Sequence, residues 1–134
     1  MAKREVSTTG LRAPNGHFSQ ATVIEAQGRL VFVSGMTARR PDGTIAGIGD
    51  ITEQTRQVCE NVKAAVEAAG GTLEDVCRVD VYVRNIEDFE KIHAVRRTYF
   101  KSPLPASTMV EVSKMVSSEY LIEISAIAVI PDRG

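Results

Sequence analysis

Two glutamates stand inside apolar runs near the C-terminal end of the chain. Glu123 lies in the run 121–124, and Glu111 lies in the run 109–112. A carboxylate in such a place can be partly desolvated, and it could then act as a general base or hold an attacking water. The alternative for each is a strand residue that faces solvent. We favour a structural role for Glu111 and leave both interpretations of Glu123 open.

The chain contains two histidines. His93 stands four residues after Phe89 and seven before Phe100, which places it on or beside the buried face of a helix. There we expect a hydrogen-bonded core or interface residue. His17 lies in the loop-like stretch 15–20, where exposure is expected. The HxH, HxxxH and CxxC spacings of metal sites are all missing from the sequence, so we predict no metal site.

Arginines occur side by side at two places, Arg39-Arg40 and Arg96-Arg97. A guanidinium can bind a carboxylate through two parallel hydrogen bonds, so each pair is a candidate carboxylate-binding group. Solvated surface charge is the more ordinary role, and we expect it for both pairs.

Two helices and a set of strands must position these residues. Apolar spacing predicts a helix over 51–69, with Asp50 as its N-cap and Glu53 completing a capping box, and a second helix over 86–100. Alternation of apolar and polar residues predicts strands at 3–7, 21–25, 30–34, 76–84, 108–112 and 121–130. The connection Gln27-Gly28-Arg29 predicts a hairpin between the second and third strands.

The resulting order is β-β-β-α-β-α-β-β. Two helices can cover only one face of such a sheet, which predicts a single α+β domain spanning residues 1–134. The other face is left half polar, and we place on it Asp80, Tyr82, Glu111, Glu123 and Ser125. A face of this mixed kind is often a subunit interface or a ligand-lined cleft, so we expect an oligomer.

Composition excludes several classes of protein. The 134 residues include 16 Lys+Arg against 17 Asp+Glu, a balance that argues against a nucleic-acid partner. No apolar run approaches the roughly 20 residues that span a bilayer, and no secretory signal is recognisable, so we expect no membrane partner. Two cysteines, Cys59 and Cys77, form no disulfide framework, and a cytoplasmic location is expected. We expect Cys59 in the core.

Several segments together resemble one family. They are the loop 16–21 (Gly-His-Phe-Ser-Gln-Ala), the strand 30–35 ending in Val-Ser-Gly, the helix segments 54–58 and 60–64, and the segments 105–106, 110–112 and 122–128. In order and spacing they are similar to the Rid, or YjgF-like, enamine/imine deaminases, over about Gly16 to Val129. The resemblance implies a chorismate-mutase-like fold and a homotrimer with clefts between its subunits.

The resemblance also implies an activity. Family members hydrolyse reactive enamines and imines such as 2-aminoacrylate to an oxo acid and ammonia, without a metal or an organic cofactor. Glu123 matches the family glutamate that positions the attacking water, and Gly35 matches a position whose backbone contacts ligand. Substrate-binding positions then fall on Phe18, His93, Ser107, Thr108 and Met109.

One departure from the family pattern bears on the substrate. Ser107 stands where the archetype has the arginine that binds the substrate carboxylate. We therefore predict a small-molecule substrate other than 2-aminoacrylate, of which a 2-aminomuconate-like compound is one candidate. The alternative is a catalytically silent trimer that binds a metabolite. RNA cleavage, attached to some relatives, is the least favoured interpretation because the charge is balanced.

Overall fold

The predicted order of helices and strands is confirmed. The computed structural model describes residues 3–25 and 27–132, so the ends of the predicted domain lie outside the described residues. The strands are β1 (Lys3–Val6), β2 (Ala21–Ile24), β3 (Arg29–Met36), β4 (Val76–Val83), β5 (Ala106–Glu111) and β6 (Ile122–Ile130). The helices are α1 (Ile51–Ala68) and α2 (Phe89–Tyr99), with the short 3₁₀ turns η1 (Leu73–Asp75) and η2 (Ile86–Asp88).

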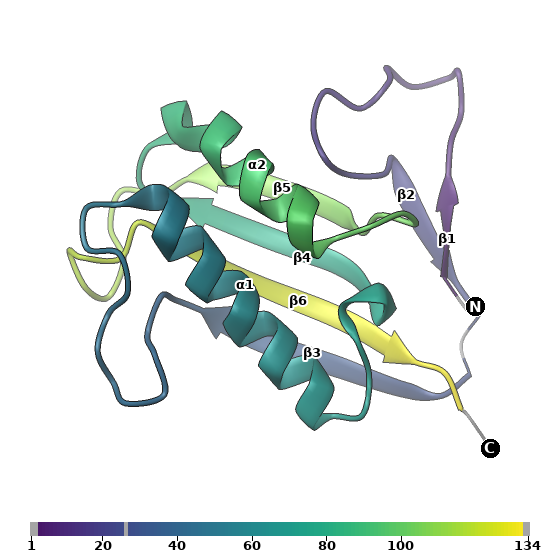
Figure 1. Cartoon of the computed structure of the whole chain (residues 1–134). Helices are drawn as coiled ribbons and strands as arrows, with labels where there is room; N and C mark the ends of the chain where they lie inside the picture. The colour runs from purple at the N-terminus through teal and green to yellow at the C-terminus, as the bar shows by residue number, and fades with distance from the viewer. Residues whose placement is uncertain (1–2, 26, 133–134) are drawn as a thin grey trace.

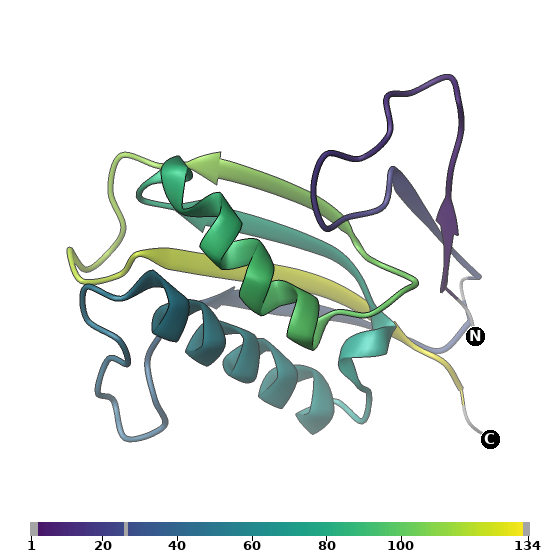
Figure 2. The same cartoon turned by 45° about the horizontal axis from the view of Figure 1, so that its top comes forward.

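Four strands form a mixed sheet in the order β3-β6-β4-β5, in which only β4 and β5 run parallel. Both helices lie on one face of this sheet, and the opposite face carries no element of the described chain (Figures 1 and 2). We call these the helix face and the open face. The predicted α+β architecture, with two helices on one side of a mixed sheet, is confirmed.

The predicted hairpin between the second and third strands is wrong. β2 pairs with β1 in a separate two-stranded sheet, whereas β3 pairs with β6, beginning at Arg29 opposite Ile130. Gly28 has a φ of +107°, and a Cβ there would lie 2.1 Å from the Ile130 carbonyl oxygen. The glycine therefore lets the chain pass close beside the end of β6. It does not turn β2 back onto β3.

The alternation read from the sequence decides which side chains are buried. On β4 the residues Val79, Val81 and Val83 are fully buried on the helix face, and the residues between them are only half-buried. α1 covers these valines with its own apolar residues, among them Cys59, as predicted. Burial raises the pKa of the Cys59 thiol to about 12, which keeps it in the unreactive protonated form.

The helix ends differ from the sequence prediction in two ways. The Asp50 side chain accepts a hydrogen bond from the Glu53 amide at 3.2 Å, but the Glu53 carboxylate pairs with Arg56, so only half of the predicted capping box forms. The second helix begins at Phe89, three residues later than predicted. The Asn85 side chain caps the turn η2 in front of it by accepting from the Glu87 amide at 3.0 Å.

Two residues lie elsewhere than predicted. Glu111 pairs in register with Val83, which puts its side chain on the helix face, where it accepts a hydrogen bond from the Ile86 amide at 3.1 Å. It therefore leaves the predicted polar face and has the structural role that we favoured. His17, which we expected to be exposed, is half-buried, and its Nε2 lies 2.8 Å from the Phe100 carbonyl oxygen. No helix in the described parts of the chain is long and apolar enough to cross a membrane.

Candidate functional site

The carboxylate of Glu123 lies in a hollow on the open face. The hollow encloses about 680 Å³ and is lined by Gly35, Tyr82 and Ser125 together with the loop residues Lys114 and Val116. Among the residues that the structure describes, none makes a hydrogen bond or an ion pair with the Glu123 side chain. A carboxylate that is half-buried and unpartnered in a hollow is available to accept hydrogen bonds from a water or a ligand.

Gly35 makes room for this carboxylate. A Cβ built at position 35 would lie 2.2 Å from Glu123 Oε2 and 2.8 Å from Cδ. Any larger residue would therefore push the carboxylate away from the β3 backbone. The missing side chain of Gly35 thus allows the close approach of Glu123 to β3, and the contact of the Gly35 backbone with a ligand stays a prediction.

A second hollow lies on the helix face, at the edge strand β5. It encloses about 400 Å³ and brings together residues from three parts of the chain. The loop before β2 supplies Gly16 and Phe18, α2 supplies Phe89, His93 and Arg96, and β5 supplies Ser107 and Met109. Four of the predicted substrate-binding residues meet here: Phe18, His93, Ser107 and Met109.

For one residue of this hollow, Arg96, the position predicted from the sequence is wrong. The prediction of surface charge is wrong for it, because Arg96 is 1% exposed. Its Nη2 donates a hydrogen bond to Ser107 Oγ at 3.1 Å, and its Nε has no partner in the part of the chain that the structure describes. Burial lowers the pKa of its guanidinium, and no carboxylate contributes to the shift.

His93 lies beside Arg96 on α2 and is buried, as predicted. Its ring meets the Phe89 ring edge to face, with centroids 5.7 Å apart, and its Nδ1 has no hydrogen-bond partner. Desolvation, followed by the positive charges of Arg96 and Arg97, lowers the pKa of His93 from its usual 6.5. Among the residues that the structure describes, none makes the expected hydrogen bond at Nδ1.

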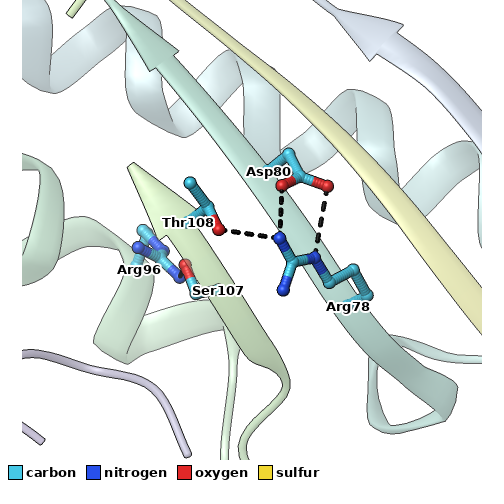
Figure 3. A network of polar contacts seen from close by, with 5 residues as sticks. All are labelled: Arg78, Asp80, Arg96, Ser107 and Thr108. Carbon is cyan, nitrogen blue, oxygen red and sulfur yellow. Dashed lines mark hydrogen bonds and ion pairs between the residues drawn. The ribbon is translucent and has the colours of Figure 1, made fainter. Parts of the chain in front are cut away.

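Thr108 is separated from the other predicted substrate-binding residues. It points to the opposite side of β5 from Ser107, and its Oγ1 accepts a hydrogen bond from Arg78 Nη2 at 2.7 Å (Figure 3). The same arginine pairs with Asp80 at 2.8 Å. Neither hollow includes Thr108 among its lining residues.

The other three candidate arginines lie outside both hollows. Arg39 and Arg40 are exposed in the loop after β3, where Arg39 donates to the Tyr120 hydroxyl at 2.7 Å and Arg40 to Thr44 Oγ1 at 3.1 Å. Arg97 is exposed on α2. The expectation of solvated surface charge is thus confirmed for these three arginines.

Six lining residues of the Glu123 hollow were not identified as site residues from the sequence, among them Tyr82 and Lys114. Tyr82 alternates with the buried valines of β4 and stands opposite Glu123 in the register, so the strand pattern alone puts it on the same face. Lys114 lies in the irregular loop before β6, and no periodic pattern signals its position.

The two hollows open on opposite faces of the sheet. Ser107 and Met109 pair in register with Val79 and Val81 on the helix face, whereas Glu123 stands opposite Tyr82 on the open face. One copy of the chain therefore cannot bring Glu123 and Arg96 to the same small molecule.

Comparisons with known proteins agree with the fold of the chain. A family model described as endoribonuclease L-PSP matches residues 10–130. A RutC family protein of Pyrococcus abyssi (strain GE5 / Orsay) is 41% identical over 128 residues, which cover 96% of this chain and 98% of that protein. A 2-iminobutanoate/2-iminopropanoate deaminase of Dermatophagoides farinae is 34% identical over 128 residues, covering 96% and 97% of the two chains.

A solved structure shares the fold. It is a protein of unknown function of the conserved Rid protein family from Yersinia pestis, with a TM-score of 0.88 at 30% identity, covering 97% of this chain and 100% of that one. The family model, over residues 10–130, spans all the residues that line the two hollows. The chain therefore belongs to the Rid family, which includes the RutC proteins and which the matching sequence model describes as endoribonuclease L-PSP.

Proposed function

We propose that this protein hydrolyses a small imine, or the enamine in equilibrium with it, to an oxo compound and ammonia. The observation that carries the proposal is the Glu123 carboxylate, which lies without a partner from the described chain in a hollow of about 680 Å³. The relative named 2-iminobutanoate/2-iminopropanoate deaminase, 34% identical over nearly the whole chain, supports this class of reaction.

The reaction adds water to a carbon–nitrogen double bond. Glu123 accepts a hydrogen bond from a water molecule, directs its oxygen at the imine carbon and takes up a proton as the carbon–oxygen bond forms. Glu123 returns this proton to the nitrogen, which gives the carbinolamine. As the carbon–nitrogen bond then breaks, the hydroxyl proton also passes to the nitrogen, ammonia leaves, and the oxo product remains. Each turnover consumes one imine and one water. Gly35 holds the geometry, because a Cβ at this position would displace the carboxylate.

We also propose that the site is completed between copies of the chain in a homotrimer. The two hollows open on opposite faces of the sheet, so a ligand that touches both needs two copies. Large apolar side chains are exposed on the open face: Leu30 and Phe32 on β3, the latter 71% exposed, and Val110 on β5. Exposed apolar residues gathered on one face are typical of protein–protein contacts.

The experiment measures ammonia release from a set of freshly generated enamines and imines, including 2-aminoacrylate, 2-iminobutanoate and 2-aminomuconate. We expect wild type to exceed the spontaneous rate for at least one compound, and Glu123→Gln to lower that excess about 100-fold or more. Glu111→Gln is the matched control and should leave the rate unchanged, because an amide oxygen can still accept from Ile86.

Two results would contradict the proposal. If wild type matches the spontaneous rate for every compound, the protein is a silent binding module and hydrolysis is rejected. If Glu123→Gln is as active as wild type, hydrolysis stands but the assigned role of Glu123 is wrong.

A further inference from the structure

Arg96 is a buried cation without an anion in the described chain. A guanidinium offers five N–H donors, yet the only hydrogen bond from this one within the described residues goes to Ser107 Oγ, and Nε is buried and unpartnered. The ion pairs found among those residues are Arg56–Glu53 and Arg78–Asp80, and neither involves Arg96. Burying an unpaired charge costs free energy, so natural proteins keep one mainly where function requires it.

We propose that Arg96 is the group that binds the carboxylate of the substrate, with Ser107 holding the guanidinium in place. This inference rests on the proposed function and deepens it. The guanidinium comes from α2, whereas the Rid resemblance led us to look for it on β5. The hydroxyl of Ser107 accepts a hydrogen bond from Nη2, and Arg96 is one of the residues that line the hollow.

The lining of the hollow indicates the class of anion. Around Arg96 stand the apolar side chains of Phe18, Phe89 and Met109, and a volume of about 400 Å³ suits a small organic molecule. The lining residues include no lysine and no second arginine. One guanidinium among apolar walls fits a monoanionic carboxylate with a small carbon body better than a phosphate, which carries more charge.

His93 provides a second unpartnered polar atom at the same place. Its Nδ1 is buried without a hydrogen bond from any described residue, and His93 lines the hollow together with Arg96. Two buried polar groups without partners in one hollow both gain hydrogen bonds when a polar ligand enters. The hollow is therefore arranged for an occupant with at least two polar atoms, as in an imino or oxo acid.

This assignment changes the prediction that Ser107 led to. From the serine at position 107 we predicted a substrate other than 2-aminoacrylate, because β5 then lacks the carboxylate-binding arginine of the family. With Arg96 bonded to Ser107 Oγ, a guanidinium reaches the same place from the neighbouring helix. The physical reason for excluding small imino acids is thereby removed, and they belong among the compounds to be tested.

The test is a binding measurement on the full chain, by calorimetry in a buffer free of carboxylates. The probes are 2-oxobutanoate, its neutral analogue 2-oxobutanamide, and inorganic phosphate. We expect wild type to bind the acid about tenfold to a hundredfold more tightly than the amide, since charge-assisted hydrogen bonds are lost with the charge. Phosphate should bind more weakly than the acid.

Arg96→Met should remove the preference for the acid over the amide. Arg97→Met is the matched control, because it deletes the adjacent, exposed arginine of the same helix, and it should keep the preference. If Arg96→Met does not fold, Arg96→Lys replaces it. It should reduce the preference about tenfold, because an ammonium lacks the planar fork of a guanidinium.

Retention of the full preference in the Arg96 variant would overturn the inference, and so would tighter binding of phosphate than of the acid. The readout does not require turnover. A protein that binds the acid through Arg96 but releases no ammonia would refute the proposed hydrolysis and leave this inference standing. If the protein releases ammonia and Arg96→Met keeps the full preference for the acid over the amide, the proposed hydrolysis stands and this inference is wrong.

Discussion

Two arginines on the two sides of β5 have opposite surroundings (Figure 3). Arg78 lies on the open face with its side chain 39% exposed, pairs with Asp80 and donates to Thr108. Arg96 lies on the helix face and is 1% exposed, and among the described residues its side chain bonds only to Ser107. The hydrogen bond to Asp80 raises the pKa of Arg78, whereas burial lowers the pKa of Arg96.

The difference shows how a functional charge can be recognised. Arg78 forms an ion pair with Asp80 of the same chain. Its charge is therefore already balanced, and it is partly screened by solvent. Arg96 has lost its hydration without gaining an anion, which is unfavourable for stability. Such a residue is retained where a ligand supplies the missing charge. The two arginines should therefore respond differently to substitution.

The largest effect is expected for Ser107→Arg. It adds a second guanidinium to a hollow that already holds one, and the two like charges repel each other in a poorly hydrated space. We expect the free energy of unfolding to fall by about 2 kcal/mol, measured by urea denaturation.

The same substitution in an Arg96→Met background should cost much less, because only one cation then occupies the hollow. An equal loss of stability in both backgrounds would show that the arginine at position 107 does not meet the charge of Arg96.

A smaller effect of opposite sign is expected for Arg96→Met alone. Removing an unpaired buried cation and keeping an apolar side chain of similar length should raise the free energy of unfolding by about 1 kcal/mol. Arg78→Met is the comparison, and it should lower stability by about 0.5 kcal/mol through loss of a surface ion pair. Thermal and urea unfolding measure both. Destabilisation by Arg96→Met larger than that by Arg78→Met would mean that Arg96 is a structural residue.

The smallest effect concerns the titration of His93. Burial and then the charges of Arg96 and Arg97 lower its pKa below 6.5, against an opposing effect of Glu90, and His17 lowers it slightly further. The unfolded chain therefore binds more protons than the folded chain just below pH 6.5, and stability falls as the pH drops through this range. An NMR titration should place the pKa of His93 below 6.5 in wild type.

Arg96→Met should raise this pKa and flatten the loss of stability below pH 6.5, whereas Arg78→Met should change neither. An unaltered His93 titration in Arg96→Met would contradict the arrangement of the two residues in one hollow.

Most of the fold follows from local patterns. The alternation on β4 and β6 and the apolar face of α1 correctly predict which side chains meet in the core. Strand pairing is different, because Gly28 is compatible both with a tight turn and with a close pass beside β6, and only the partner strand decides between them. Glu111 was assigned to the wrong face for a similar reason, since the faces of an edge strand depend on its register with β4.

The candidate site was predicted in part. Spacing identified His93 as buried, and the same spacing applies to Arg96, which stands seven residues after Phe89 and four before Phe100. Because arginine is charged, we expected Arg96 at the surface, although its spacing is that of a buried residue. That Glu123 and Ser107 lie on opposite faces could not be read from the sequence, because it requires the order and register of three strands.

The most direct test of the whole account is a subunit-mixing experiment with Glu123→Gln and Arg96→Met. Each variant alone should lack most of the ammonia release, since every site then lacks either the water-directing carboxylate or the anion-binding guanidinium. If the two groups come from different copies, co-expressed variants should recover about a quarter of the wild-type activity, because random assembly rebuilds that share of the sites. Activity in the mixture no higher than in either variant alone would contradict a site shared between subunits.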